Sequence, residues 1–238
     1  MDPVGDLNEE EIRSLLPDRP VRSYPAALST DADALAWGRA GAPEGALVVA
    51  EYQASPRGRA GLEWKPRPGR SLVFSLVLRP RLPLPREGWL YVVASLGVAD
   101  ALDGGTTLRW PDEVWRDAER AGAVATHLEV GPRATEWAVV TVFVVDAPPP
   151  RAPLLARVVE AIEARYRAPS ASGLADYLRG CETLGRRVRA RLIPLGPAGT
   201  VIEGSASTVQ TDGSLVIETD EGRRLAVLPH GLGFLDEL

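Results

Sequence analysis

Hydrophobic residues gather in short runs along the chain, and the spacing within each run predicts the type of element. Gly45–Tyr52 and Ser71–Leu78 are predicted to be buried strands, because they are largely apolar and lie next to turn residues. Ala121–Glu129 and Glu136–Asp146 are also predicted strands, and the second is rich in β-branched residues. Thr106–Arg109 is a shorter predicted strand.

Between these strands, apolar residues recur with the spacing of a helix. Most of these segments are bounded by residues of the types that begin or end helices. Ser29-Thr30-Asp31 favours a helix start, because such side chains accept hydrogen bonds from free backbone N–H groups. Further helices are predicted at Asn8–Leu16, Trp89–Leu102, Leu154–Arg167 and Gly173–Cys181. Strands that alternate with helices predict an α/β (α+β) fold with a mixed sheet and flanking helices.

The pattern changes after Leu184, where short strands separated by glycine turns replace the longer elements. The predicted strands are Arg187–Pro194, Thr200–Val209, Ser214–Thr219 and Arg224–Leu228. Asp212-Gly213 and Glu221-Gly222 are hairpin signals. We therefore expect an N-terminal extension over residues 1–23, an α/β domain over 24–183 and a small all-β barrel over 184–238.

The overall composition is that of a globular protein and argues against several classes of function. The chain has 238 residues, of which 45% are hydrophobic and 25% charged, and a net charge of −5. This negative balance argues against nucleic acid or a membrane surface as the main partner. The N-terminus does not resemble a signal peptide, and no apolar run is long enough to span a bilayer, so a cytoplasmic protein is expected.

Residues that commonly bind metals or act as nucleophiles are scarce. One cysteine, Cys181, and two histidines, His127 and His230, cannot form a His/Cys zinc site of the usual kind. A structural or surface role is favoured for both histidines, and Cys181 is interpreted as a small buried hydrophobic residue. The 27 basic residues comprise 26 arginines and a single lysine, Lys65. No metal site built from protein ligands alone is expected.

The segment after the first predicted strand combines arginine, glycine and tryptophan. Arg57 and Arg59 are separated by Gly58, so two guanidinium groups can flank one phosphate while the backbone comes close to it. Trp64 follows five residues after Arg59 and offers a flat ring for stacking on a purine. The position of this loop, directly after a strand that ends in Gln53, favours an anion-binding loop over a solvated surface loop.

This arrangement resembles the biotin protein ligase family. That family has a strand ending in Gln, a Gly-Arg-Gly-Arg-Arg-Gly loop, a nearby Trp and a Pro/Gly turn into a further strand. The matching positions here are Gln53, Pro56–Gly61, Trp64, Pro68-Gly69, Ser71–Leu78, Ser29-Thr30-Asp31, Arg109–Glu113, Cys181–Val188, Gly204–Ala206 and Asp212–Leu215. The resemblance implies a biotin/lipoate ligase-like domain followed by an SH3-like barrel, in a form without an N-terminal DNA-binding domain.

The resemblance also implies a two-step reaction. Biotin and ATP, with Mg²⁺, give biotinyl-AMP and pyrophosphate, and a lysine of a biotin-carrier protein domain then attacks the mixed anhydride. The first step brings two anions together, so it needs positive charge between the carboxylate and the α-phosphate. Members of the family often pair through a sheet edge, which leaves a homodimer open for this chain.

Individual residues acquire expected roles from the same resemblance. Ser29, Thr30 and Gln53 fall where the family holds biotin. Arg57, Gly58 and Arg59 fall in the loop that covers the biotinyl-adenylate. Trp64 falls where the adenine packs, and Asp112 falls, with Glu113 beside it, near the magnesium and phosphate region.

Three departures from the family pattern bear on activity. The family places a lysine near the reacting groups. Here a gapless count puts Arg120 at that position, whereas a loop shorter by one residue puts Glu119 there. Pro56 replaces the first glycine of the loop and removes an N–H group. Thr141–Asp146 carries larger side chains where the family has Gly-x-Gly-x-Asn.

Three hypotheses follow. The first is a biotin ligase in which Arg59 and Arg120 stabilise phosphate charge. The second is a ligase-like protein that binds a small ligand or a partner without turnover, and the departures motivate it. The third is an enzyme that activates a different carboxylic acid on the same scaffold.

Overall fold

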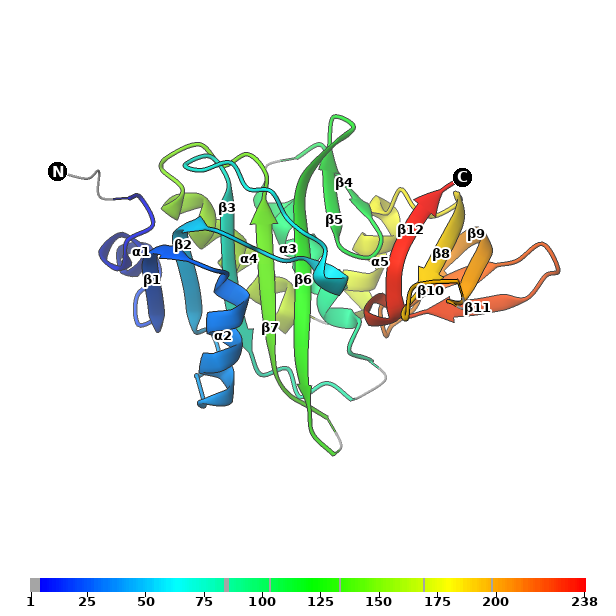
Figure 1. The fold of residues 1–238 in the computed structure, drawn as a ribbon, viewed down its shortest axis with the longest axis horizontal. Helices are drawn as coiled ribbons and strands as arrows, with labels where there is room; N and C mark the ends of the chain where they lie inside the picture. The colour runs from blue at the N-terminus through cyan, green and yellow to red at the C-terminus, as the bar shows by residue number, and fades with distance from the viewer. Residues whose placement is uncertain (1–4, 84–85, 103, 133, 169, 198) are drawn as a thin grey trace.

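A seven-stranded mixed sheet forms the centre of the molecule (Figure 1). The computed structural model describes residues 5–83, 86–102, 104–132, 134–168, 170–197 and 199–238. In spatial order the strands are β1 (Val21–Ala27), β2 (Leu47–Gln53), β3 (Leu72–Leu78), β7 (Thr135–Val144), β6 (Glu119–Val130), β5 (Glu113–Arg116) and β4 (Thr106–Arg109). Strands β1 and β2 are parallel, and the remaining neighbours are antiparallel. The predicted mixed sheet is therefore confirmed.

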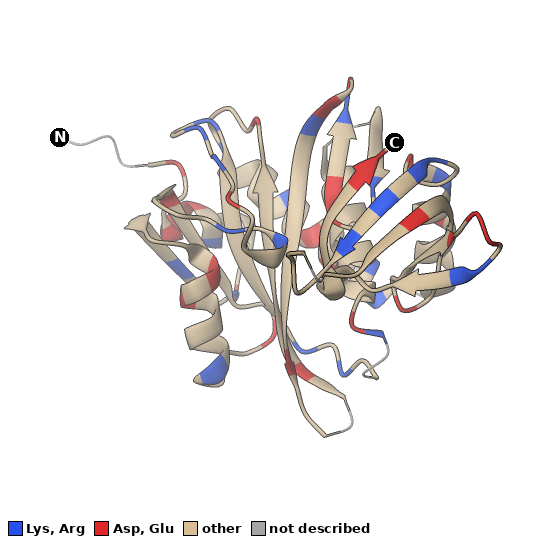
Figure 2. Cartoon of the chain, turned by 45° about the vertical axis from the view of Figure 1, so that its right-hand side comes forward, with Lys and Arg blue, Asp and Glu red and all other residues tan. Residues whose placement is uncertain are grey.

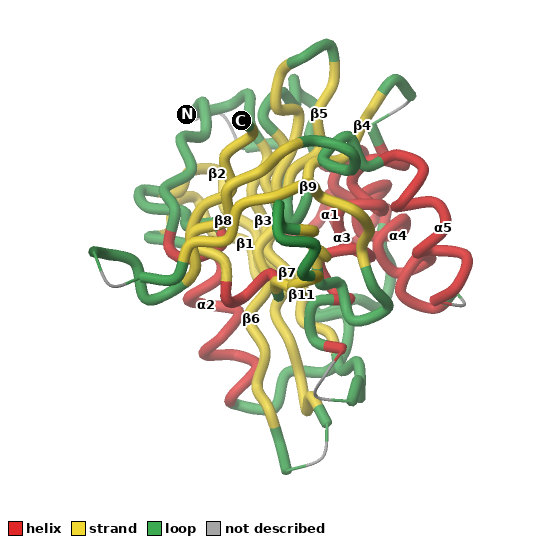
Figure 3. Tube along the Cα trace, turned by 90° about the vertical axis from the view of Figure 1, so that its right-hand side faces the viewer, coloured by secondary structure: helices red, strands yellow, loops and turns green. Residues whose placement is uncertain are grey.

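Helices cover both faces of this sheet. In Figure 3 most helices gather on one side of the sheet, and α2 (Thr30–Arg39) lies apart from them. The gathered helices are α1 (Glu9–Leu15), α3 (Trp89–Ala101), α4 (Ala152–Arg167) and α5 (Ser170–Gly180). Gly97 lets α3 approach α4 closely, because a Cβ there would lie 2.6 Å from the backbone of Ile162. No helix within the described ranges is long and apolar enough to cross a membrane.

Alternation along the central strands assigns side chains to the two faces. On β3, Phe74 and Leu76 join the large core under α3 and α4. Val73, Ser75 and Val77 point to the opposite face, where α2 packs. The loop between β2 and β3 crosses this second face in front of β7 and β6 (Figure 1), so it is the face on which the predicted loop lies.

The predicted helices and all the predicted strands are present, but three further strands were not predicted. Strand β1 contains Pro25 and lies at the sheet edge, where a missing N–H is tolerated. Strand β5 has only four residues and pairs with β4. Strand β12 (Leu232–Glu237) forms because it pairs with β8, although Gly233 within it weakens its own strand propensity. Residues 1–4 of the expected N-terminal extension lie outside the described residues.

The C-terminal strands form a separate five-stranded antiparallel sheet. Its order is β11 (Arg224–Val227), β10 (Leu215–Glu218), β9 (Val201–Val209), β8 (Arg187–Leu192) and β12. Gly213 and Gly222 have φ values of 84° and 76°, as their predicted hairpin turns require. The described pairings give an open sheet order, so closure into an SH3-like barrel stays a prediction.

The C-terminal sheet packs closely against the main body. The indole Nε1 of Trp110 donates a hydrogen bond to the carbonyl oxygen of Gly213 at 2.9 Å. Trp110 also donates its backbone N–H to Thr183 Oγ1 at 3.0 Å. A Cβ on Gly213 would lie 2.3 Å from the backbone of Gly88, so no side chain fits at this contact. These contacts hold the two sheets in a defined arrangement.

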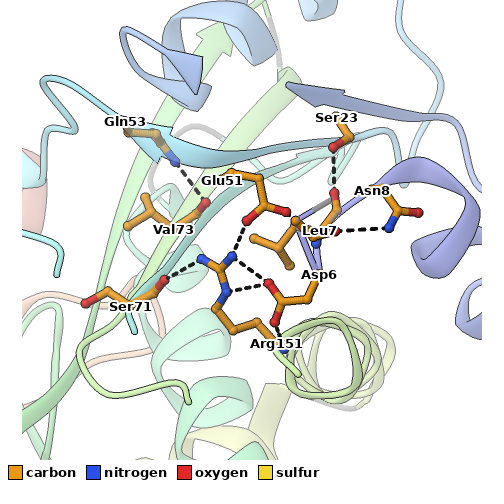
Figure 4. A network of polar contacts seen from close by, with 10 residues as sticks. Asp6, Leu7, Asn8, Ser23, Glu51, Gln53, Ser71, Val73 and Arg151 are labelled. Atoms are coloured by element: carbon orange, nitrogen blue, oxygen red, sulfur yellow. Dashed lines mark hydrogen bonds and ion pairs between the residues drawn. The ribbon is translucent and has the colours of Figure 1, made fainter. Parts of the chain in front are cut away.

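The N-terminal segment is tied to the main body by a buried arginine (Figure 4). Arg151, 3% exposed, lies at the start of α4 and forms ion pairs with Asp6 and Glu51. The backbone N–H of Leu7 donates to Glu51 Oε1 at 2.7 Å. Glu51 belongs to β2, so this network fixes the segment beside the strand that leads into the loop.

Candidate active site

The loop between β2 and β3 forms a compact hairpin-like structure. Gly58 donates its N–H to the carbonyl of Leu62 at 2.7 Å, and Trp64 donates to the carbonyl of Pro56 at 3.2 Å. The short 3₁₀ helix η1 (Arg59–Gly61) forms the tip. A Cβ on Gly58 would lie 2.4 Å from the indole Nε1 of Trp64. Glycine at position 58 therefore allows the tryptophan to fold back against the loop.

Arg59 connects this loop to both sheets. Its side chain is buried, and its Nε lies 3.3 Å from Asp112 Oδ1. Its Nη1 donates to the carbonyl of Leu232 and, at 3.4 Å, to that of Gly233, both in β12. Arg59 is thus held by one carboxylate and by the C-terminal sheet. Arg57, in contrast, is exposed.

Burial perturbs the carboxyl group of Asp112. Desolvation raises the pKa of Asp112 from 3.8 to about 6, because a buried carboxylate loses its hydration. The guanidinium of Arg59 opposes this shift, and the neighbouring charge of Glu113 adds to it. The carboxyl group of Asp112 therefore changes its charge close to neutral pH.

A cavity of about 340 Å³ lies beside Arg59, and we call it the tryptophan cavity. The residues of the main body that line it include Arg59, Glu63, Trp64, Arg109, Asp112, Glu113 and Arg120. Phe234, Leu235 and Glu237 of β12 close it from the side of the C-terminal sheet. The cavity therefore lies between the two parts of the chain and combines aromatic rings with charges of both signs.

Arg120 and Glu119, the two candidates for the family's lysine position, lie differently relative to the tryptophan cavity. Both side chains are exposed, but Arg120 lines the tryptophan cavity and Glu119 does not. Arg120 Nη1 lies 3.1 Å from Glu113 Oε1, and Glu113 Oε2 accepts a hydrogen bond from Trp115 Nε1 at 2.8 Å. Glu113 therefore holds the guanidinium of Arg120 at the cavity, and which residue takes the lysine's place stays a prediction.

Trp64 is packed against another aromatic ring and also lines the tryptophan cavity. It stacks on Phe143, with ring centroids 5.4 Å apart and an angle of 30° between the planes. Phe143 is buried beneath the tryptophan and is not part of the cavity lining. Phe143 therefore supports Trp64 and leaves the tryptophan cavity open.

A second cavity, of about 330 Å³, lies beneath the loop, and we call it the loop cavity. Residues 57–61 cover it, and it extends to α2 on one side and to β6 and β7 below. Its other lining residues are Asp31, Leu35, Tyr91, Ala125, Thr126, His127, Val139, Thr141 and His230. Arg59 lines both this cavity and the tryptophan cavity.

Ser29, Thr30 and Gln53 are buried and hydrogen-bonded within the protein. Ser29 caps α2 by accepting from Ala32 N–H at 3.4 Å. Gln53 Oε1 accepts from Thr30 N–H at 2.9 Å, while its Nε2 donates to the carbonyl of Val73 at 2.8 Å. None of the three lines the loop cavity or the tryptophan cavity. Their hydrogen bonds connect the start of α2 to the end of β2.

The structure thus brings together two groups of the predicted residues. Arg57, Gly58 and Arg59 cover the loop cavity, and Arg59, Trp64, Asp112 and Arg120 line the tryptophan cavity. Sequence reasoning missed Phe234, Leu235 and Glu237, because no local motif marks residues that approach from another sheet. It also favoured an inert role for both histidines, and His127 and His230 both line the loop cavity. In the described part of the chain, no three or more His, Cys, Asp or Glu side chains cluster as metal ligands.

Comparison with known proteins identifies similar chains. A biotin–[acetyl-CoA-carboxylase] ligase of Mycobacterium tuberculosis is 30% identical, over 85% of this chain and 84% of that protein. The bifunctional ligase/repressor BirA of Bacillus subtilis is 24% identical, over 92% of this chain and 76% of its own. The biotin protein ligase of Aquifex aeolicus, in complex with biotin and ATP, has a similar fold, with a TM-score of 0.71 at 20% identity over 92% of this chain and 99% of that one. No protein-family model matches the chain.

Proposed function

The chain belongs to the biotin protein ligase family, and from this premise we propose that it joins biotin, or a similar carboxylate, to AMP and transfers the acyl group to a carrier lysine. The mycobacterial relative is named as a ligase of this kind, and the Aquifex protein binds biotin and ATP. The acceptor we propose is a biotin-carrier protein domain.

The observation that carries this proposal is that Arg59 lines both cavities. A biotinyl-adenylate has an acyl part and a nucleotide part, joined by an anhydride. We assign the acyl part to the loop cavity, whose lining mixes the apolar Leu35, Ala125 and Val139 with a few polar groups. The nucleotide part then occupies the tryptophan cavity, and the anhydride lies beside the guanidinium of Arg59.

This placement gives each predicted residue a physical role. Arg59 and Arg120 supply positive charge where the carboxylate of the substrate meets the α-phosphate. Both arginines are already held by carboxylates of the protein, so they need to move little during the reaction. Trp64, supported by Phe143, offers its ring to the adenine. Arg57 and Gly58 shape the loop that covers the adenylate. Ser29, Thr30 and Gln53 position the end of β2 and the start of α2 at the acyl part.

Asp112 and Glu113 are the residues we propose to hold Mg²⁺ together with the phosphates. Mg²⁺ in nucleotide sites is usually bound by one or two carboxylates plus substrate phosphates, and both carboxylates line the tryptophan cavity. The bound ion supplies charge neutralisation to the phosphates. Asp112 binds it only in the ionised form, so the raised pKa of this group makes ion binding weaker below about pH 6.

Four further features belong to the same proposal. We place the protein in the cytoplasm, with neither nucleic acid nor membrane as a partner. Two copies pair as a homodimer. The chain divides functionally into an extension over residues 1–23, a catalytic domain over 24–183 and a C-terminal module over 184–238.

Pyrophosphate release tests the proposal directly. The chain is mixed with biotin, ATP and Mg²⁺, and release is expected only when biotin is present. Arg120→Ala is expected to lower kcat/KM by about 10²- to 10³-fold, the usual effect of removing one group that stabilises developing charge. Arg189→Ala, an exposed arginine of the C-terminal sheet, is the matched control and keeps full activity. A folded chain that binds biotinyl-AMP tightly without any release supports the non-catalytic hypothesis instead.

A further inference from the structure

The loop between β2 and β3 is basic, although the chain as a whole is acidic. Residues 54–71 contain five basic residues and one acidic residue, whereas the whole chain has a net charge of −5. Arg59 is buried at the candidate active site, and the other four basic side chains are exposed. Figure 2 shows basic positions along this loop. The surface around the loop therefore attracts anions in a molecule that otherwise repels them.

The positive charge of this loop is only partly neutralised by the protein. Arg67 and Arg70 both pair with Asp146, at 2.8 and 2.9 Å, so two guanidinium groups share one carboxylate. Within the described ranges of the chain, Arg57 forms no ion pair. In the C-terminal sheet, by contrast, each of the three arginines of β8 has a carboxylate of its own. The loop thus keeps positive charge that a partner can neutralise.

Two exposed apolar side chains lie at the base of the same loop. Tyr52, near the end of β2, is 49% exposed, and Leu28, directly after β1, is 69% exposed. The pairing of Ala26 with Tyr52, and the hydrogen bond from Ser55 N–H to the carbonyl of Leu28, place them close together. Tyr52 also lines a shallow groove together with Arg67. Tyrosine and arginine are the residue types that most often dominate the binding energy of protein interfaces.

This surface adjoins the candidate active site. The loop cavity is lined by Arg57, and the tryptophan cavity is lined by Trp64 of the same loop. A protein bound to Tyr52, Arg67 and Arg70 therefore lies beside both cavities. In the proposed reaction the one macromolecular substrate is the carrier, and its lysine must reach the anhydride between these cavities.

We propose that Leu28, Tyr52, Arg57, Arg67 and Arg70 form a docking surface for an acidic face of the carrier domain, an inference that rests on the proposed function. The arginines accelerate the encounter through long-range attraction, and the apolar side chains provide the contact that keeps the complex together. The acidic face of the carrier lies beside its acceptor lysine, so the same attraction directs the lysine towards the cavities.

Transfer kinetics test this proposal. The full chain is supplied with pre-formed biotinyl-AMP and with a biotin-carrier domain that has Asp and Glu residues beside its acceptor lysine. At low salt, Arg67→Glu/Arg70→Glu is expected to raise KM for this carrier about tenfold, while pyrophosphate release without a carrier is unchanged. Added salt should reduce the difference between this variant and the wild type. Arg187→Glu/Arg189→Glu reverses two charges on the C-terminal sheet and is the matched control with an unchanged KM.

Two further variants separate the charge from the apolar contact. Asp146→Asn removes the carboxylate that Arg67 and Arg70 share, so it is expected to lower KM for the acidic carrier, the opposite of the charge reversal. Tyr52→Ala is expected to raise KM with the salt dependence kept, because no charge is lost. A change of KM in the same direction for Asp146→Asn and for Arg67→Glu/Arg70→Glu would mean that loop structure, and not charge, controls docking, and overturns the proposal.

The partner is tested from the other side as well. Changing the Asp and Glu residues beside the carrier's lysine to Asn and Gln should raise KM for the wild-type chain and leave KM for Arg67→Glu/Arg70→Glu unchanged. Equal KM values for both carriers overturn the proposal. Binding of the wild-type chain to phosphatidylserine vesicles, lost in Arg67→Glu/Arg70→Glu, would assign the surface to a membrane and overturns it too.

Failure of the proposed function gives a different result. A chain that releases no pyrophosphate with biotin and ATP has failed at adenylation. Calorimetric titration with the acidic carrier requires no catalysis and still tests docking in that chain. Binding that is lost in Arg67→Glu/Arg70→Glu and kept in Arg187→Glu/Arg189→Glu supports the docking surface. A chain that is active in pyrophosphate release and binds the carrier equally well in all these variants overturns the inference alone.

Discussion

At the scale of single residues, the buried pair of Arg59 and Asp112 is the central feature. Removing one partner of a buried ion pair is strongly destabilising, because the other charge is left without compensation. Arg59 has additional acceptors in the carbonyls of Leu232 and Gly233, which keep its charge hydrogen-bonded when Asp112 is protonated. The pair can therefore change its protonation state without loss of the arginine's position.

The raised pKa of Asp112 predicts how stability depends on pH. The folded protein binds this proton more tightly than the unfolded chain does, since the pKa rises from 3.8 to about 6. The stabilisation is fully present below about pH 4 and is lost as the pH rises through about 6. The free energy of unfolding is expected to fall by at most about 3 kcal/mol over this range. Urea unfolding from pH 4 to 8 is expected to show this fall in the wild-type chain.

The substitution Asp112→Asn removes the titrating group and is expected to remove that part of the pH dependence. Asp146→Asn is the control, because Asp146 is an exposed carboxylate that pairs with Arg67 and Arg70. Identical pH profiles for the wild type and Asp112→Asn would show that Asp112 has an ordinary pKa.

At the scale of the element, the loop between β2 and β3 depends on close packing between its own residues. Gly58 lies against the indole of Trp64, and Trp64 lies on Phe143 of β7. The loop is thereby anchored to the sheet through one aromatic ring. A change at Gly58 therefore reaches the tryptophan cavity through Trp64.

The substitution Gly58→Ala tests this dependence. The added Cβ would lie 2.4 Å from Trp64 Nε1, so the indole must move away from its place on Phe143. We expect a loss of about 1–3 kcal/mol in stability, typical of overpacking, together with a higher KM for ATP. Gly180→Ala is the matched control, since its Cβ meets nothing closer than 3.7 Å. Unchanged stability and KM in Gly58→Ala would contradict the proposed packing.

At the scale of the whole molecule, the C-terminal sheet completes the candidate active site. Strand β12 accepts hydrogen bonds from Arg59 and lines the tryptophan cavity through Phe234, Leu235 and Glu237. Trp110 and the close contact between Gly88 and Gly213 hold this sheet in place. The tryptophan cavity therefore exists only when both parts of the chain are docked.

Phe234→Ala is expected to raise KM for ATP roughly tenfold, about 1.4 kcal/mol, because an aromatic wall of the tryptophan cavity is lost. The side chain is 38% exposed, so thermal stability should change little. Val201→Ala, which removes another exposed apolar side chain of the same sheet, is the control and should leave KM unchanged. Steady-state pyrophosphate release at varied ATP concentrations measures both variants. Equal KM values would place the nucleotide elsewhere.

Local sequence patterns accounted for most elements and for the loop, because both depend on residues close in the chain. Ser29 caps α2 as predicted, and the apolar run at Ser71–Leu78 gives β3. The predicted loop, with Gly58 between two arginines and Trp64 nearby, does join β2 to β3, while its role in binding an anion stays a prediction. Periodicity, caps and turns each involve a few neighbouring residues, so they can be read without knowing what packs against them.

The sequence by itself determined the family resemblance, most of the elements and the residue types of the loop. The tertiary structure decided that Arg120 rather than Glu119 faces the tryptophan cavity, that Asp112 and β12 hold Arg59, and that Phe143 supports Trp64. These outcomes depend on strand register and on the packing of segments far apart in the chain. A one-residue change of register turns a side chain to the other face, and only the packed molecule selects the register.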